Sequence, residues 1–230
     1  MRRRRKHESD PDAVAEGDLA QHALTARVEA LGPLGRGTVS GADLTAAGIN
    51  KTASALFDQG KRDQAIELWR SLADTGDAAA TANLVIEYSA DGRYDEALAM
   101  WRSPQVQGMN IPPHDPGLRL RTTNRRLAAE GWWRTATEHL KDDRSCEYLG
   151  IALRERGETD EAARWFRQGA ERGDAACARE LAGILYQKSA AATDADEQLK
   201  LAAEMLTWLR QAAAKGDDFA RKMLRDFNLG

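Results

Sequence analysis

Residues 69–80 read WRSLADTGDAAA, and close copies of this stretch recur as FRQGAERGDAAC at 166–177 and as LRQAAAKGDDFA at 209–220. Each copy joins a helix-favouring run to a Gly-Asp dipeptide. Glycine commonly ends a helix because it adopts the left-handed backbone conformation, and an aspartate side chain can accept a hydrogen bond from the first turn of the following helix. The stretch therefore predicts the end of one helix, a tight turn and the start of the next helix.

A second spacing pattern runs through the same region. Gly60 is followed at five residues by alanine and at nine by an aromatic residue, and this spacing returns 32 residues later at Gly92 and again at Gly157. The order is typical of a helical hairpin, in which glycine makes the turn, alanine lies where the helices approach, and the aromatic ring fills the core. A further copy is predicted at Gly131, with Ala136 and Leu140, if the Pro-rich segment 103–117 is an insertion. The other matched positions are Ala65 and Trp69, Ala97 and Trp101, and Ala162 and Phe166.

The repetition predicts an all-α fold, a right-handed solenoid of about five helical hairpins. Alanine, leucine, arginine and glutamate are abundant, and no convincing strand pattern is present. The expected hairpins span 42–76, 77–104, 118–141, 143–173 and 174–216, and a capping helix follows at 217–228. Ahead of this repeat domain, 42–230, we expect a disordered tail at 1–17 and a single helix with a Gly-rich linker at 18–41.

Leu149-Gly150-x-x-Leu153 and Ala182-Gly183-x-x-Tyr186 place a small residue in the first helix of two hairpins. Together with the glycine, alanine and aromatic spacing, this pattern resembles the tetratricopeptide repeat. The A-x-x-G-D-x-x-A endings at 73–80 and 213–220 are similar to the related Sel-one-like repeat. The resemblance implies a scaffold or adaptor, not an enzyme, that binds a peptide or helix of a partner protein in a concave groove lined by the first helices.

In the frame of this resemblance, polar side chains of the first helices face the groove. They are Asn50 and Lys51, Asn83, Arg121 and Arg125, and Arg154. Arg121 and Arg125 are four residues apart and are expected to share one helix face, with Leu120 and Leu127 turned to the core. Arginine binds carboxylates well, so the expected partner is a protein or peptide with an acidic segment. The alternative is that these charges are solvated or paired with neighbours such as Glu130 and Glu147.

The charge pattern leaves a second class of function open. Net charge is −3, and the chain without the cationic residues Arg2 to Lys6 carries −8. An acidic body argues against nucleic acid as the partner. The alternative function is a regulatory protein that contacts nucleic acid through the Arg-rich tail.

A third class, an enzyme, would need a site near the 103–117 segment. His114 and Asp115 lie there, and Trp132 and Trp133 follow, but no motif for nucleophilic catalysis accompanies them.

Consecutive helical residues point about 100° apart, so one of the two tryptophans, Trp132 or Trp133, is expected to be partly exposed as a partner anchor.

No cofactor, metal or disulfide is expected. The only cysteines, Cys146 and Cys177, are not in a metal-binding spacing and are expected to be buried thiols. The basic N-terminus is followed by polar residues, not by the apolar core of a signal peptide, and no apolar run approaches the roughly 20 residues of a membrane span. The sequence thus favours a cytoplasmic protein without membrane contact, and its 25 arginines against 8 lysines are typical of GC-rich bacterial, for example actinobacterial, coding sequences.

Overall fold

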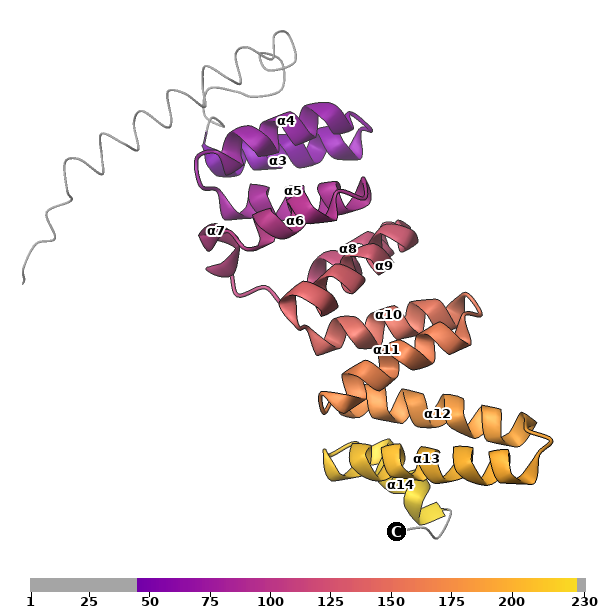
Figure 1. Ribbon diagram of the computed structural model, residues 1–230. Helices are drawn as coiled ribbons and strands as arrows, with labels where there is room; N and C mark the ends of the chain where they lie inside the picture. Colours follow the sequence, from indigo (N-terminus) through magenta and orange to yellow (C-terminus); the bar gives the residue numbers. More distant parts are fainter. Residues whose placement is uncertain (1–44, 227–230) are drawn as a thin grey trace, which may run out of the picture. The chain divides into compact units, whose positions relative to one another are not determined.

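The structure, a computed structural model, describes residues 45–226, and every element within this range is a helix (Figure 1). The predicted tail at 1–17 and the predicted helix and linker at 18–41 lie outside the described residues. None of the described helices combines the length and the apolar character that crossing a membrane requires.

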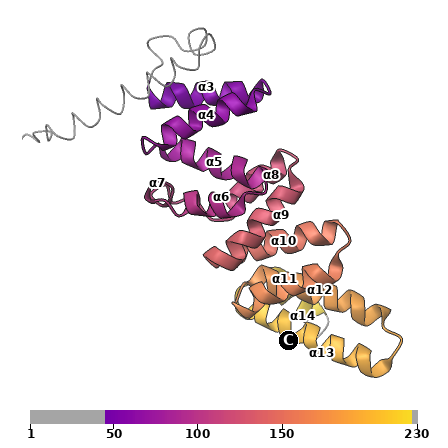
Figure 2. The ribbon, with the colours of Figure 1, turned by 45° about the horizontal axis from the view of Figure 1, so that its top comes forward.

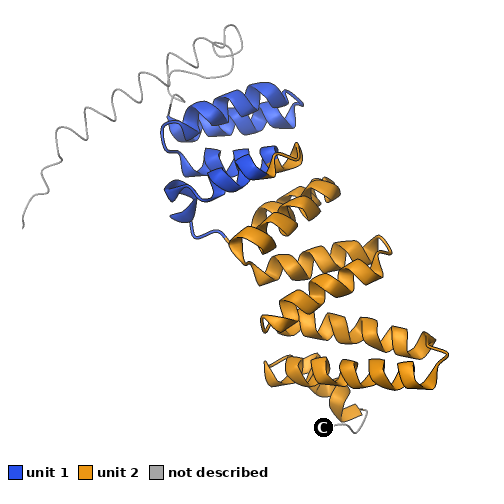
Figure 3. Cartoon of the chain, viewed as in Figure 1, with its two compact units in different colours: residues 1–88, 95–111 blue, residues 89–94, 112–230 orange. Residues whose placement is uncertain are grey.

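The chain divides into two compact units, and each is described by itself (Figure 3). Unit 1 contains residues 1–88 and 95–111, and unit 2 contains residues 89–94 and 112–230, so the end of α5 and the start of α6 are assigned to unit 2. Helices α3, α4 and α7 lie wholly in unit 1. The bounds of the first five helices are α3 (Ala46–Asp58), α4 (Arg62–Ala73), α5 (Ala78–Ala90), α6 (Tyr94–Trp101) and α7 (Pro104–Gln107). Unit 2 continues with α8 (Asp115–Thr122), α9 (Arg126–Thr135), the π-helical turn η1 (Ala136–Leu140), α10 (Asp143–Glu155), α11 (Thr159–Glu171), α12 (Ala175–Ala191), α13 (Ala195–Ala214) and α14 (Asp218–Asp226).

Consecutive helices pack against each other as hairpins. In unit 1 α3 packs on α4, and in unit 2 the pairs are α8 with α9, α10 with α11, and α12 with α13. Neighbouring hairpins of unit 2 are in contact because α9 packs on α10 and α11 packs on α12, and α14 packs on α13 after the last hairpin (Figure 2). The predicted all-α class and its hairpin repeat are confirmed for the described residues.

The Gly-Asp dipeptides make the turns that the sequence predicts. All three glycines have a positive φ, and each aspartate side chain accepts a hydrogen bond from the backbone N–H three residues later at 2.7 or 2.8 Å. These turns are Gly76-Asp77, Gly173-Asp174 and Gly216-Asp217. A fourth turn lacks glycine: Lys141, at φ 58°, precedes Asp142, whose carboxylate accepts from the N–H of Ser145 at 2.8 Å. The repeat therefore has more turns than its glycines indicate.

The third hairpin differs from the prediction because its turn also lacks glycine. Asn124, at φ 62°, makes the left-handed turn between α8 and α9, and Ala129 and Trp133 follow it at five and nine residues. Asparagine visits this conformation more readily than most residues because its short polar side chain can hydrogen-bond locally. Gly131, the predicted turn, lies inside α9, where an added Cβ would meet the Tyr94 hydroxyl at 2.0 Å.

The segment 103–117 is consequently not an insertion. Asn124 lies 32 residues after Gly92, the same offset that separates Gly92 from Gly60. The segment contains α7 and the beginning of α8, so the hairpin predicted at 118–141 begins at Asp115 instead. Proline is favoured in the first turn of a helix, where its missing N–H costs nothing, and each of these two helices has proline there. A Pro-rich composition thus marks two helix starts in this chain.

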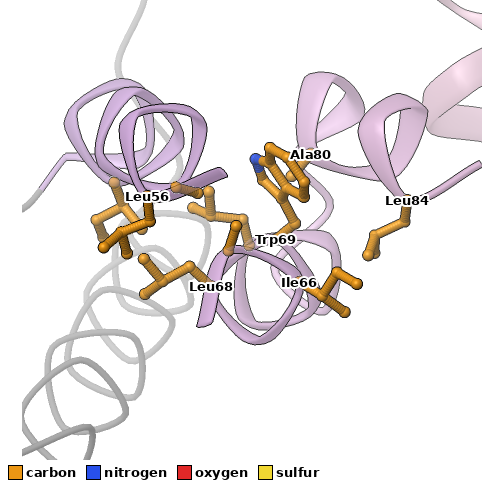
Figure 4. Close-up of a cluster of buried hydrophobic side chains, with 10 residues drawn as sticks. Leu56, Ile66, Leu68, Trp69, Ala80 and Leu84 are labelled. Atoms are coloured by element: carbon orange, nitrogen blue, oxygen red, sulfur yellow. The ribbon is translucent and has the colours of Figure 1, made fainter. Parts of the chain in front are cut away.

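Trp69 joins the first two hairpins in the core of unit 1 (Figure 4). Its side chain is 4% exposed and extends from α4 toward Ala80, near the start of α5. Leu56 of α3 and Leu84 of α5 belong to the same buried cluster. The aromatic position nine residues after the turn therefore packs between hairpins, as the spacing predicts.

Phe166 occupies the corresponding position in unit 2. An added Cβ at Gly150 would meet the Phe166 ring at 2.5 Å, so this ring packs directly on the backbone of α10. Gly150 is thereby confirmed as a small residue at a close approach. Gly183 is not, because an added Cβ there would meet nothing within 4 Å. Ala182, which lies 32 residues after Gly150 and is 3% exposed, takes the equivalent place.

We expect Gly150→Ala to lower the free energy of unfolding by about 1–3 kcal/mol, because the new methyl group overlaps the Phe166 ring. Gly183→Ala is the matched control in the same unit and should raise the free energy of unfolding by about 0.5–1 kcal/mol, since alanine is the better helix former and has free space. Urea denaturation followed by circular dichroism measures both. Equal effects of the two substitutions would contradict the packing described for α10 and α12.

The turn at Asn124 allows a second test. Asn124→Gly should leave the free energy of unfolding unchanged or slightly higher, whereas Asn124→Ala should lower it by about 1–2 kcal/mol, because a Cβ without a local hydrogen bond is disfavoured in the left-handed region. Both variants are compared in the same denaturation assay. If alanine proved as stable as glycine, the third turn would have to lie elsewhere.

Candidate partner-binding surfaces

The predicted groove residues are divided between the two units: Asn50, Lys51 and Asn83 belong to unit 1, and Arg121, Arg125 and Arg154 belong to unit 2. In unit 1 the two asparagines come together. The Asn50 side-chain oxygen accepts hydrogen bonds from Trp69 Nε1 at 2.8 Å and from Asn83 Nδ2 at 3.3 Å. Lys51 is exposed. The asparagine pair thus satisfies the buried indole of Trp69, which is a structural task.

Arg121 and Arg125 do not share a helix face, contrary to the prediction. Arg121 lies in the last turn of α8, and Arg125 is the N-cap residue of α9, with the left-handed turn at Asn124 between them. The same turn changes the direction of Leu127, which is 71% exposed instead of facing the core. Leu120, which precedes the turn, is fully buried as predicted.

The arginines of the first helices in unit 2 form ion pairs with the next first helix. Arg121 of α8 donates to Glu155 of α10 at 2.8 Å, and Arg154 of α10 donates to Glu180 of α12. The alternative interpretation, that these charges are paired, therefore holds for both arginines, although with partners other than those expected. Two arginines of the predicted basic strip, Arg121 and Arg154, are thus neutralised by glutamates in unit 2.

A further set of ion pairs, which the sequence analysis missed, joins the second helices. Arg134 of α9 pairs with Glu161 of α11 at 3.1 Å, and its guanidinium lies 5.3 Å from the centre of the Trp165 ring. Burial acts to raise the pKa of Glu161, but hydrogen bonds from Arg134 and Trp165 outweigh it and the pKa lies below its ordinary value. A similar arrangement is found between α11 and α13. Glu204 and Trp208 lie 43 residues after Glu161 and Trp165, and Glu204 pairs with Arg167 and accepts a hydrogen bond from Trp208 Nε1. The spacing E-x-x-x-W at 161–165 and 204–208 was the available signal.

Trp132 and Trp133 are both fully buried, so the prediction that one of them is an exposed anchor is wrong. α9 packs on α8 and also on α10, and two indoles that point in different directions therefore both meet covered surfaces. Their Nε1 atoms donate to the consecutive carbonyl groups of Pro113 and His114 at 2.7 and 3.1 Å. These bonds hold the start of α8 against α9.

His114, in the region predicted as the location of any enzyme site, is the N-cap residue of α8, and its side chain makes no capping hydrogen bond. The imidazole lies 3.5 Å from the carboxylate of Asp142 and 3.9 Å from that of Asp115, and its ring centre lies 5.4 Å from that of Tyr148. Ser145 Oγ donates to Asp142 at 2.6 Å, so the carboxylate lies between the hydroxyl and the imidazole. A histidine activates a serine by accepting the hydroxyl proton itself. This order of groups does not allow that transfer.

Within residues 45–226, no group of histidine, cysteine, aspartate and glutamate side chains is placed to hold a metal ion. Cys146 and Cys177 are free thiols, and both are fully buried. Burial raises the pKa of each thiol, which disfavours the thiolate that reacts with oxidants and binds metals.

A small hollow opens in unit 2 beside the turns of the third and fourth hairpins. The space open to water is about 50 Å³, and its lining is formed by Arg121, Arg126, Ala129, Glu130, Trp133, Ala152, Glu155 and Arg156. Glu130 is 7% exposed and accepts a hydrogen bond from Arg156 at 2.7 Å. Burial raises the pKa of Glu130, against the opposing effect of Arg156. Of these residues, the sequence analysis predicts two as site residues: Arg121 as a groove residue and Trp133 as a possible exposed anchor.

α12 presents an exposed surface of a different kind. Gly183 and Tyr186 are three residues apart, so they lie on one side of the helix, and Tyr186 is 51% exposed. Glu180 precedes Gly183 by three residues on that side, and its ion pair with Arg154 of α10 borders the surface. We call these four residues the first-helix surface. On this surface the exposed ring of Tyr186 lies next to the open space at Gly183.

No protein-family model and no curated protein matches the sequence. Among solved structures, the chain is similar to a Sel1 repeat protein from Oxalobacter formigenes, with 20% sequence identity and a TM-score of 0.42 over 93% of this chain and 86% of that chain. The class of the protein, an all-α protein built from repeated helical hairpins, follows from the helices and turns described above.

Double-mutant cycles on Arg121 with Glu155 and on Arg154 with Glu180 should give coupling free energies of about 0.2–1 kcal/mol, because water reaches each pair: the two arginines are 36% and 41% exposed. The coupling should fall as the salt concentration rises, since ions screen exposed charges. Alanine variants, single and double, are denatured with urea at low and high salt. A coupling of about 3 kcal/mol or more, as for buried pairs, would contradict the surface character of these contacts.

Proposed function

We propose that this protein is an interaction scaffold that binds a segment of a partner protein on the first-helix surface of unit 2. The observation that carries the proposal is Gly183, a glycine inside α12 that has open space around it and stands next to the half-exposed ring of Tyr186. Its partner is a peptide or helix, in agreement with what the repeat resemblance implies.

The fold does not need a glycine at position 183. Glycine inside a helix lowers stability by about 0.5–1 kcal/mol relative to alanine. Gly150 has a packing reason for this cost, because the ring of Phe166 lies on it, but a side chain at Gly183 would touch nothing. The missing side chain leaves the backbone of α12 accessible, and close approach by another molecule is a use for such a position.

Tyr186 supplies the other property that a binding surface needs. Tyrosine is enriched at protein interfaces because its ring offers a large apolar area at low conformational cost, with a hydroxyl for hydrogen bonding. The ion pair of Arg154 and Glu180 lies at the border of the surface, where a polar rim is typical. The acidic character of the chain outside Arg2 to Lys6 favours a protein over nucleic acid as the partner.

Capture of partners from the native lysate, with the full chain as bait and mass spectrometry as the readout, tests the proposal. Gly183→Lys should reduce the recovery of a specific partner at least ten-fold, because the new side chain fills the open space, and Tyr186→Ala should reduce it through loss of the ring. Ala203→Lys is the matched control, since Ala203 is an exposed alanine of α13 and not part of the first-helix surface.

Circular dichroism must show that each bait variant is folded. We expect Gly183→Lys to fold, because a side chain at position 183 would meet no other atom of the described residues within 4 Å at its Cβ. A partner that Gly183→Lys and Ala203→Lys retain equally well would exclude the first-helix surface as its binding site. A partner lost by all the variants alike would point to a general effect of charge or stability and would also contradict the proposal.

A further inference from the structure

We infer that the hollow beside the turns of the third and fourth hairpins is a binding site for a single carboxylate group, with Arg126 as its principal ligand. This site is separate from the first-helix surface. The inference therefore goes beyond the proposed function and does not depend on Tyr186 or Gly183.

The charges around the hollow leave one cation unneutralised. Glu155 is paired with Arg121 at 2.8 Å, and Glu130 is paired with Arg156 at 2.7 Å. Arg126 is exposed and has no ion-pair partner among the described residues. Arg156 is shared between Glu130 and Glu158, so Arg126 is the lining cation without a carboxylate partner in residues 45–226, and one negative charge on an occupant would pair with it.

The size and the walls of the hollow restrict the occupant further. Its volume of about 50 Å³ accommodates a carboxylate and a methylene group, while pockets that take whole cofactors or drug-sized ligands measure roughly 300–1,000 Å³. The fully buried Trp133 contributes an apolar wall, which lowers the local dielectric and strengthens the attraction between Arg126 and an anion. A phosphate, with a charge nearer −2, would meet the carboxylates of Glu130 and Glu155 with only one free cation.

The arginines around the hollow are held by the fold at their backbones. Arg126 is the first residue of α9, two residues after the left-handed turn at Asn124. Arg156 is the C-cap residue of α10, directly before the left-handed Gly157, and its guanidinium also pairs with Glu158. The two turns fix the backbone positions of these arginines, and the ion pairs with Glu130 and Glu158 hold the guanidinium of Arg156. Planar guanidinium groups match carboxylates by paired hydrogen bonds.

Nuclear magnetic resonance titration of the isotope-labelled full chain tests the site with defined probes. N-acetylglycylglycine carries a free carboxylate, and its amide is the matched probe without charge. Succinate and inorganic phosphate complete the set. We expect saturable shifts of signals from Trp133 and its neighbours with N-acetylglycylglycine, and at least ten-fold weaker binding of the amide and of phosphate. Tighter binding of the peptide than of succinate would assign the carboxylate to a peptide, and the reverse would assign it to a small organic acid.

Arg126→Gln should weaken binding of the carboxylate probe at least ten-fold without unfolding, because Arg126 is exposed and unpaired. Arg225→Gln is the matched control, since Arg225 is also exposed and lies outside the hollow. Absence of saturable binding, equal binding of the amide, or an unchanged response of Arg126→Gln would each overturn the inference. Gly183→Lys should leave the titration unchanged, so failure of this site and failure of the first-helix surface are separable.

Discussion

The structure depends on a backbone constraint, the left-handed residue that ends a helix and turns the chain back. α3, α10 and α11 have 13 residues each, and isolated helices of that length are marginal in water. Their stability must come from packing, and the position of the turn determines which sides pack. Five residues after the turns at Gly60, Asn124 and Gly157, which lie inside hairpins, comes a buried alanine, and nine residues after them Trp69, Trp133 or Phe166 lies in the core. Moving one turn would expose these rings.

The sequence predicts this framework wherever glycine makes the turn. The hairpins with Gly60 and Gly157 and the caps after the Gly-Asp dipeptides are as expected, because glycine has a low cost in the left-handed region and aspartate caps well. Asn124 and Lys141 take the same conformation without glycine, and a search by residue type therefore missed them. The offset of 32 residues from Gly92 was the information that would have located Asn124.

The errors about the site follow from that missed turn. With the turn placed at Gly131, Arg121 and Arg125 appeared to share a helix, and Leu127 appeared to face the core. The burial of both Trp132 and Trp133 could not be predicted from the sequence either, because it depends on α8 and α10 covering different sides of α9. The partners of the ion pairs were also not predicted from the sequence. Arg121 meets a glutamate 34 residues away, and only the packing of successive hairpins brings such residues together.

Paired charges also change what the surface of unit 2 can do. Each exposed ion pair contributes little to stability, on the order of 0–1 kcal/mol, but the pairs leave Arg121 and Arg154 without a free charge to attract a distant partner. Long-range electrostatic steering needs extended regions of one sign. A partner of this surface would therefore be selected at short range, where an open backbone, an exposed ring or a single unpaired guanidinium differs from the neutral surroundings. In unit 2, Gly183, Tyr186 and Arg126 are residues of this kind.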